Sequence, residues 1–233
     1  MTSTTYVRSV DYFFFVHILL LWIYTKNSFN GEIKMKEFNK FAITTTVFFS
    51  IHGLICGANG VVFLTWLGQN ISKDGFAIQS IVGSILGVLT PMLFMIPWVI
   101  KISKEKAMTL AWLVFIALTV LGILFVVNTN GYVLIVIDTC VSVTIVGLYA
   151  YSKQALYNVT IVGDVRTKFN SQIAAVGSLA TAGGAAVATL LPAEQWLIGL
   201  LIILSAVNFI FTSWYQLPKL IFWMNQEVVF GDK

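Results

Sequence analysis

Residues 107–151 decide the fold of this chain. They read AMTLAWLVFIALTVLGILFVV (107–127), NTNG (128–131) and YVLIVIDTCVSVTIVGLYAY (132–151). Each apolar run has about the 20 residues that an α-helix needs to cross about 30 Å of hydrocarbon, and the Asn-Thr-Asn-Gly break between the runs is a turn signal. The stretch therefore predicts a helical hairpin that crosses a membrane twice.

Asp138 is the single charged side chain of this hairpin. It follows the break by about seven residues, which at 1.5 Å per residue places it about 10 Å inside the membrane. A carboxylate there costs on the order of 3 kcal/mol or more to insert, and such residues usually face a cavity or a partner. Asp138 is therefore the first candidate for a functional group, with a structural hydrogen bond to a neighbouring helix as the alternative.

The composition points to the same class of protein. Of the chain, 58% is hydrophobic and 10% is charged, and the mean hydropathy is +0.87, which leaves too little polar surface for a soluble globule. Cys56 and Cys140 lie inside apolar runs and are expected to be small buried hydrophobes. No zinc spacing, nucleophile elbow, phosphate loop or dinucleotide glycine pattern occurs. We expect an integral membrane protein that is no enzyme, holds no metal or cofactor and binds no nucleic acid.

The uncharged runs predict an all-α fold with six transmembrane helices, at 41–67, 75–100, 107–127, 132–152, 169–191 and 196–217. Three domains follow: a short hydrophobic helix with a Lys-rich cytoplasmic linker (1–40), the six-helix bundle (41–217) and a cytoplasmic tail (218–233).

The run at residues 12–25 is the short helix, and a signal peptide is the alternative reading of it. Asp11 offsets Arg8 ahead of the run and no small-residue cleavage site follows, which weighs against a signal peptide. With the linker on the cytoplasmic side, only Arg8 and Lys73 of the 14 Lys and Arg residues lie outside. Such an asymmetry predicts the orientation of the bundle.

A second group of polar residues lies on the first long helix. His52, Cys56 and Asn59 stand at i, i+4 and i+7, so they share one face. A packing role through hydrogen bonds is the alternative to a site role for His52. On the Asp138 helix, Ser142 and Tyr149 continue the face of Asp138 at i+4 and i+11. These two faces are the candidate walls of a solute site.

A resemblance to a known family rests on residues 163–171, GDVRTKFNS, which lead into residues 177–184, GSLATAGG. Together with the six-helix order and the basic loop at 101–106, they resemble one half of a major facilitator superfamily transporter. Within the superfamily the chain looks most like the second half of the glycoside-pentoside-hexuronide cation symporters. It departs from the usual loop pattern at Ile100, where an aspartate is common, and at Ser103, where a glycine is common.

The resemblance implies secondary transport of a small polar solute, a sugar or glycoside, coupled to H⁺ or Na⁺. In this reading the chain is a half or a fragment of a larger transporter in a bacterial plasma membrane. It rocks against a second half, which is an identical copy, a separately encoded chain or the missing part of a longer sequence. The expected roles are solute binding for His52, Asn59, Ser142 and Tyr149, cation coupling for Asp138, and a cytoplasmic gate for Asp164 and Arg166. A multidrug-type exporter of the same superfamily and a non-transporting scaffold or accessory subunit are the alternatives.

Overall fold

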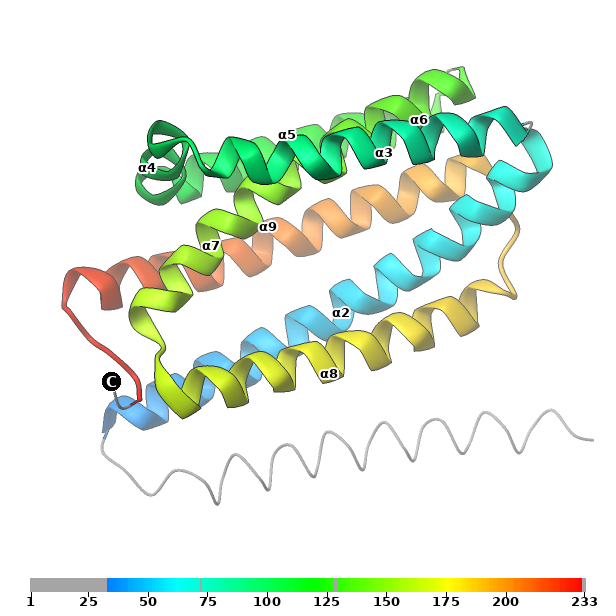
Figure 1. Ribbon diagram of the computed structural model, residues 1–233. Helices are drawn as coiled ribbons and strands as arrows, with labels where there is room; N and C mark the ends of the chain where they lie inside the picture. Colours follow the sequence, from blue (N-terminus) through cyan, green and yellow to red (C-terminus); the bar gives the residue numbers. More distant parts are fainter. Residues whose placement is uncertain (1–32, 72, 128–129, 232–233) are drawn as a thin grey trace, which may run out of the picture. The chain divides into compact units, whose positions relative to one another are not determined.

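The computed structural model describes residues 33–71, 73–127 and 130–231 (Figure 1). Over these residues the chain is helical apart from short connections and one isolated β-bridge, between Ile161 and Phe230. Five of the described helices are long and apolar enough to cross a membrane. The chain is therefore a multi-pass all-α membrane protein, as its sequence predicts.

The helices follow one another in this order: α2 (Ile33–Asn70), α3 (Lys73–Phe94), α4 (Pro97–Glu105), α5 (Ala107–Val126), α6 (Gly131–Cys140), the π-helix η1 (Val141–Val146), α7 (Gly147–Thr160), α8 (Gly163–Ala188) and α9 (Gln195–Asn225). The five membrane-length helices are Lys36–Asn70, Ala107–Val126, Gly131–Thr160, Gly163–Ala188 and Gln195–Asn225. The predicted count of six is not confirmed by these five helices.

The chain divides into two compact units, Met1–Thr44 and Thr45–Lys233. Of the first unit, the structure describes the helical residues 33–44, where the rings of Phe38 and Phe41 lie 6.5 Å apart. The short hydrophobic helix predicted at residues 12–25 lies outside the described residues. The linker predicted at 26–40 is helical from Ile33 onward, because charged side chains end an apolar run without ending the backbone hydrogen bonds of a helix.

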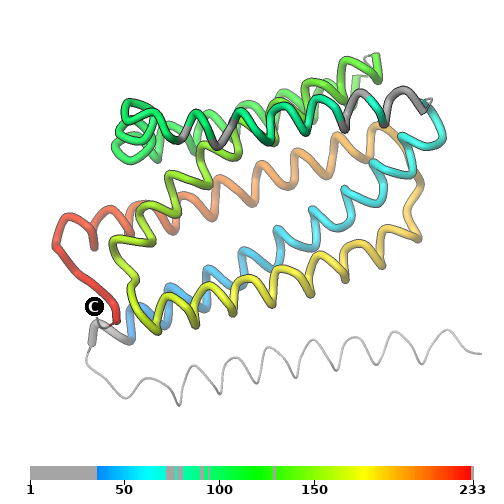
Figure 2. The backbone as a smooth tube through the Cα atoms, in the orientation of Figure 1, coloured from blue at the N-terminus to red at the C-terminus, as the bar shows by residue number. Residues whose placement is uncertain are grey.

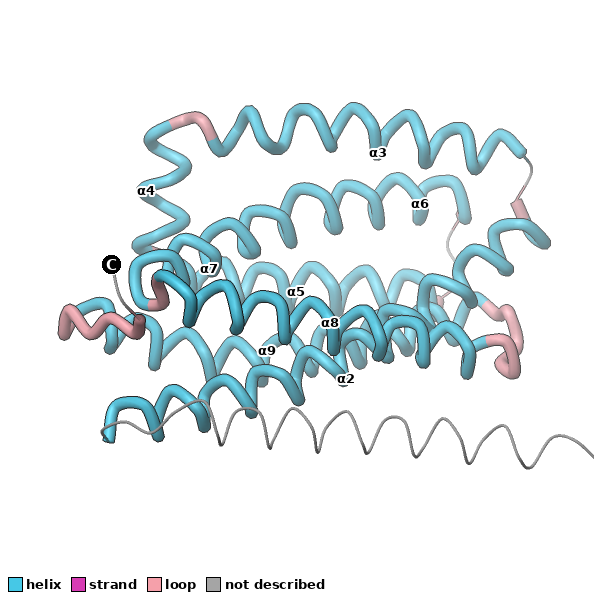
Figure 3. Tube along the Cα trace, turned by 60° about the horizontal axis from the view of Figure 1, so that its bottom comes forward, coloured by secondary structure: helices cyan, strands magenta, loops and turns pink. Residues whose placement is uncertain are grey.

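The predicted span 75–100 is interrupted at Met95 and Ile96. Ile96 has φ −76° and ψ 115°, which is the extended conformation that a following proline imposes. Pro97 then begins α4, a position that suits a residue without an N–H, and Figure 3 shows α4 leaving the direction of α3. The basic loop expected at 101–106 is therefore largely helical, and within it Lys101 and Glu105 form an exposed i,i+4 ion pair at 4.0 Å.

The connection between the predicted spans 132–152 and 169–191 is also mostly helical. The helix that begins at Gly131 continues to Thr160, and α8 begins at Gly163, whose φ of +56° suits a glycine at this sharp turn. The charged Lys153 marks the end of the apolar run, whereas the end of the helix is set by the turn. Asp164 and Arg166 therefore lie in the first turn of α8 and not in a loop.

The predicted cytoplasmic tail is partly helical and partly folded back. α9 passes through Pro218 and ends at Asn225. Beyond it, the N–H of Phe230 donates to the carbonyl of Thr160 at 2.9 Å, and the N–H of Val162 donates to the carbonyl of Phe230 at 2.9 Å. The end of the chain is thereby attached to the turn between α7 and α8.

Glycines allow two pairs of helices in the second unit to approach closely. A Cβ at Gly122 of α5 would lie 2.8 Å from the carbonyl oxygen of Gly199 in α9, and a Cβ at Gly57 of α2 would overlap the carbonyl of Thr181 in α8. Figures 1 and 2 show α8 passing beside the middle of α2. Small residues at such crossings are typical of membrane bundles, where close backbone packing replaces the hydrophobic effect.

The helix from Gly131 to Thr160 changes direction at η1. α6 packs against α3 and α5, whereas α7 packs against α9 and α4, and Figure 1 shows α7 crossing toward the start of α8. A π-helix inserts an extra residue into the turn and is a common cause of kinks. The bend separates the part of the helix that holds Asp138 from the part that holds Tyr149.

The core of the second unit is built from aromatic and branched side chains near one end of the bundle. Phe63 and Trp66 of α2 both meet the ring of Phe125 in α5 edge-on, at centroid distances of 6.2 and 6.1 Å. Leu134 and Ile198 pack into the same cluster and are fully buried. The buried side chains of this cluster are all hydrophobic, so they supply packing and no chemistry.

Candidate functional site

Asp138 lies in α6, seven residues after the helix begins. Its side chain is partly buried, on a helix that packs against α3 and α5. Among the described residues the carboxylate forms no ion pair, since Lys101 and Glu105 form the only one found there. At about 10 Å from the helix end, Asp138 is a membrane-embedded carboxylate without a cationic partner in the described part of the chain.

The π-helix η1 begins three residues after Asp138 and contains Ser142. Ser142 is exposed on the surface of the protein. π-helical turns occur frequently at functional sites, because the bulge leaves backbone groups able to rearrange. The structure thus places a carboxylate next to an irregular turn and leaves the hydroxyl of Ser142 away from the interior.

The polar face predicted on α2 is present. The thiol of Cys56 lies 3.4 Å from Nε2 of His52, as expected for residues four apart on a helix. The side-chain oxygen of Asn59 is buried and has no hydrogen-bond partner among the described residues. His52 is partly buried, and the ammonium of Lys153 is close enough to act on it electrostatically.

Tyr149 is buried and belongs to a polar layer between α7 and α9. Its hydroxyl lies 2.8 Å from Oγ of Ser213, and its ring meets Phe209 edge-on at 4.5 Å. Two turns further along α7, the hydroxyl of Tyr157 donates to Oε1 of Gln216 at 3.1 Å. The layer therefore joins two tyrosines of α7 to two polar side chains of α9.

Gln216 extends this layer to α2. It is fully buried, and its Nε2 donates to Oγ1 of Thr45 at 3.2 Å. Both ends of the amide are thus paired, as a buried amide requires. The hydrogen bonds connect α7, α9 and α2 at the level of Tyr157.

Lys153 lies between the two tyrosines on the same face of α7. Its ammonium is 4.8 Å from the ring centre of Phe49, 5.4 Å from that of Tyr149 and 6.0 Å from that of Tyr157. These distances fall in the range of cation–π contacts. Aromatic rings from two helices surround this lysine. The sequence analysis missed this feature, because the predicted membrane span 132–152 ends before Lys153.

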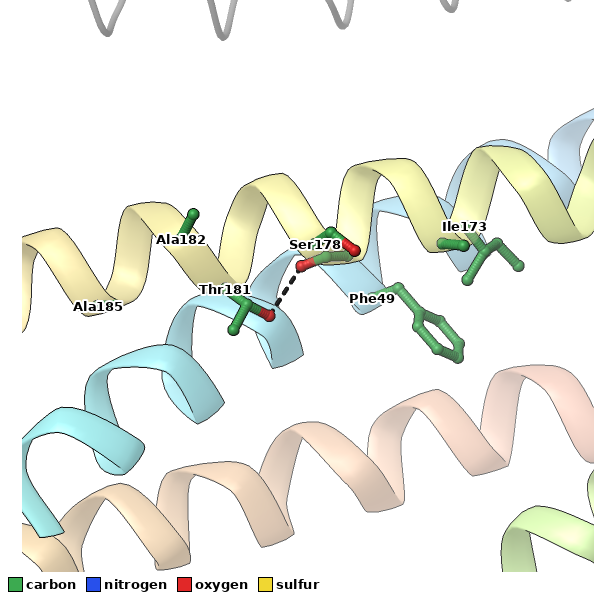
Figure 4. A pocket seen from close by; sticks show the side chains of 8 residues that line it. Phe49, Ile173, Ser178, Thr181, Ala182 and Ala185 are labelled. Atoms are coloured by element: carbon green, nitrogen blue, oxygen red, sulfur yellow. Dashed lines mark hydrogen bonds between the residues drawn. The ribbon is translucent and has the colours of Figure 1, made fainter. Parts of the chain in front are cut away.

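A groove runs beside this cluster, between α2 and α8 (Figure 4). Its volume is about 560 Å³, within the range of small-molecule sites. The lining is mainly small and apolar, and it consists of Phe49, Ile173, Ala174, Gly177, Ser178, Thr181, Ala182 and Ala185. Thr181 donates to the carbonyl of Gly177 at 2.8 Å, so Ser178 supplies the hydroxyl best able to meet a ligand.

The predicted gate residues lie at the start of α8. Asp164 is exposed in the first turn, where a negative charge is favourable beside the positive end of the helix dipole. Arg166 donates from Nη1 to Oδ1 of Asn158 in α7 at 3.4 Å. Within the described residues Arg166 therefore links α8 to α7, and it forms no ion pair with Asp164.

The structure brings together only some of the predicted site residues. His52 and Tyr149 both lie near Lys153, and Phe49 joins this cluster from one turn before His52. Asp138 is eleven residues before Tyr149 on the same helix, a separation of about 16 Å, so it belongs to a different region. The signal for the missed residues was the spacing of Tyr149, Lys153 and Tyr157, which are four apart and share a helix face.

Among the described residues, no group of three His, Cys, Asp or Glu side chains is placed to hold a metal ion. Comparison of the chain with protein-family models, with curated proteins and with solved structures finds no match.

Proposed function

We propose that this chain is part of a secondary transporter that carries a small polar solute across the membrane, coupled to H⁺ or Na⁺. The observation that carries the proposal is Asp138, a carboxylate within a membrane-spanning helix that has no cationic partner among the described residues. Such a residue is costly to insert and is typical of ion pathways and coupling sites. The protein is proposed to act in a bacterial plasma membrane.

The bend at η1 supports a moving part in this mechanism. Asp138 lies on one side of the π-helix, and the cluster of His52, Tyr149 and Lys153 lies on the other. A cation that binds at Asp138 would change the charge beside a turn whose hydrogen bonds are already irregular. The proposed consequence is a change in the angle between α6 and α7, which moves one wall of the solute site.

The proposed solute site combines groups from α2 and α7. His52, Asn59 and Tyr149 are assigned to hydrogen bonds with the solute. The buried oxygen of Asn59 has no hydrogen-bond partner among the described residues, which supports its assignment. Ser142, which is exposed on α6–α7, would meet the solute only from a second half that covers it. Asp164 and Arg166 are proposed as a cytoplasmic gate, supported by the link from Arg166 to Asn158 across the turn between α7 and α8.

A second half is part of the proposal. Transporters of the superfamily that the sequence resembles place the solute site between two six-helix halves, and this chain supplies one set of such helices. The partner is an identical chain or a separate one. A sugar or glycoside is the solute class that the resemblance implies, and the apolar lining of the groove favours, as a second candidate, an exporter of less polar compounds.

The experiment that tests the proposal is uptake in proteoliposomes with the full chain. A panel of radiolabelled hexoses and hexosides is offered with an imposed proton or sodium gradient, for the wild type and for Asp138→Asn. The variant is expected to lose gradient-driven accumulation by about tenfold or more, because the amide cannot exchange a charge with the cation, while equilibrium exchange of the solute continues.

Glu105→Gln is the matched control, since Glu105 is an exposed carboxylate on α4 and its removal should leave accumulation unchanged. If Asp138→Asn accumulates solute as the wild type does, Asp138 has no coupling role. If no member of the panel is accumulated by the wild type under either gradient, the proposal of coupled transport fails for this solute class.

A further inference from the structure

The ammonium of Lys153 is surrounded by aromatic rings and has no anionic partner among the described residues. The rings of Phe49, Tyr149 and Tyr157 lie 4.8, 5.4 and 6.0 Å from Nζ. No carboxylate of the described residues lies within ion-pair distance of it, because the one ion pair found there joins Lys101 and Glu105. The site therefore holds a positive charge that no negative charge in the described part of the chain balances.

The surroundings of Lys153 make this arrangement costly. The side chain is partly buried, and three aromatic rings lie around its ammonium. A charged group removed from water is usually paired, and the faces of aromatic rings return only part of the lost hydration. An anion beside Nζ would compensate for the hydration that the ammonium has lost.

The side chains that face Lys153 from the neighbouring helices do not supply that anion. On α2 they are Phe49 and His52, and the nearby groups of α9 are neutral, namely Ser213 and Gln216. Ser213 and Gln216 are already hydrogen-bonded to the tyrosines of α7. The local environment is therefore neutral or positive, which favours an anionic ligand over a cationic one.

The groove beside the cluster sets the shape of that ligand. Phe49 is shared, because its ring contacts the ammonium of Lys153 and also lines the groove. The close-up in Figure 4 shows this ring projecting from α2 beside Ile173 of α8. The remaining lining is mostly alanine and glycine with the hydroxyl of Ser178, which suits a compact, largely apolar body and not a molecule rich in hydroxyls.

We propose that Lys153 is the anion-binding group of a site for small monocarboxylates, with the apolar body of the ligand lying in the groove between Phe49 and α8. The inference rests on the proposed transport function and gives the solute class of its second candidate, the transporter of less polar compounds. The carboxylate would accept a charge-assisted hydrogen bond from Nζ, and the rings around it would keep water away and strengthen that bond.

The test is equilibrium binding to the full chain in nanodiscs of phosphatidylcholine. Two probes of equal shape are compared, benzoate and the uncharged benzamide. The wild type should prefer benzoate, and Lys153→Gln should bind benzoate about 10- to 100-fold more weakly, because a hydrogen bond between charged groups is lost. The binding of benzamide should not change.

Lys219→Gln is the matched control, because Lys219 of α9 also lies over a tyrosine ring, 4.0 Å from the centre of Tyr215, yet does not belong to the cluster. Its benzoate affinity should stay within about twofold of the wild type. Lys153→Met, whose apolar side chain suits the three rings, repeats the measurement if the glutamine variant unfolds.

Equal affinity of the wild type for benzoate and benzamide overturns the inference, as does an equal loss in the Lys153 and Lys219 variants. The binding measurement needs no ion gradient, so it tests the anion site at Lys153 separately from coupled transport. A chain that binds benzoate through Lys153 but accumulates neither benzoate nor any sugar of the panel under either gradient supports this inference and overturns transport. A chain that accumulates solute equally well with Lys153→Gln, and shows no preference for benzoate, overturns this inference and leaves transport standing.

Discussion

Replacement of Gly57 by alanine should push α2 and α8 apart. A Cβ at this position would overlap the carbonyl oxygen of Thr181 and lie 3.0 Å from the backbone nitrogen of Ala185. Backbone atoms of a helix cannot rotate out of the way, so the helices must shift, and such overpacking costs about 1–3 kcal/mol. The gain in helix propensity from glycine to alanine returns about 0.5–1 kcal/mol.

Gly60→Ala is the matched control, because it lies one turn later on α2 and a Cβ there meets no atom within 4 Å. This variant should keep only the propensity gain. The propensity gain is common to both variants, so they are expected to differ by the overpacking cost of about 1–3 kcal/mol, which corresponds to about 3–9 °C in melting temperature for a chain of this size. The measurement is the apparent melting temperature in nanodiscs at one fixed scan rate, since membrane proteins commonly unfold irreversibly.

The same comparison is available on the opposite helix. A Cβ at Gly184 of α8 would overlap the carbonyl of Leu54, whereas a Cβ at Gly177 meets nothing within 4 Å. Gly184→Ala should therefore melt well below Gly177→Ala. If Gly57→Ala and Gly60→Ala melt within about 2 °C of each other, α2 and α8 do not pack through their glycines, and the groove between them loses its structural basis.

Two further predictions concern topology and assembly. In a chain whose Cys56 and Cys140 are replaced by alanine, Lys104→Cys should react only with a thiol reagent on the cytoplasmic side, and Asn130→Cys only with a reagent outside. The reason is that the lysine-rich connections lie inside. Reaction from the opposite sides would show the reverse orientation. Native mass spectrometry from detergent should show an assembly heavier than the 25.8 kDa single chain, because one set of helices forms only one wall of the proposed site. A monomer that accumulates solute by itself would contradict the need for a second half.

The ends of the helices show where sequence reasoning stops. Hydropathy placed the span of residues 132–152 inside the helix that runs from Gly131 to Thr160, but it ended the span at Lys153. A hydropathy pattern responds to side-chain polarity, whereas a helix ends where its backbone hydrogen bonds end. The same difference explains the helical residues 33–40 and the extension of α9 to Asn225.

The sequence by itself determined the class of the protein, because a run of about 20 uncharged, apolar residues is stable mainly as a membrane-spanning helix. It also identified Asp138, since a single carboxylate in an apolar run stands out without any structure. Only the tertiary structure decided that Phe49 of α2 joins Lys153 and its two neighbouring tyrosines of α7. That contact depends on how α2 meets α7, and such contacts between helices distant in the chain leave no periodic pattern in either one.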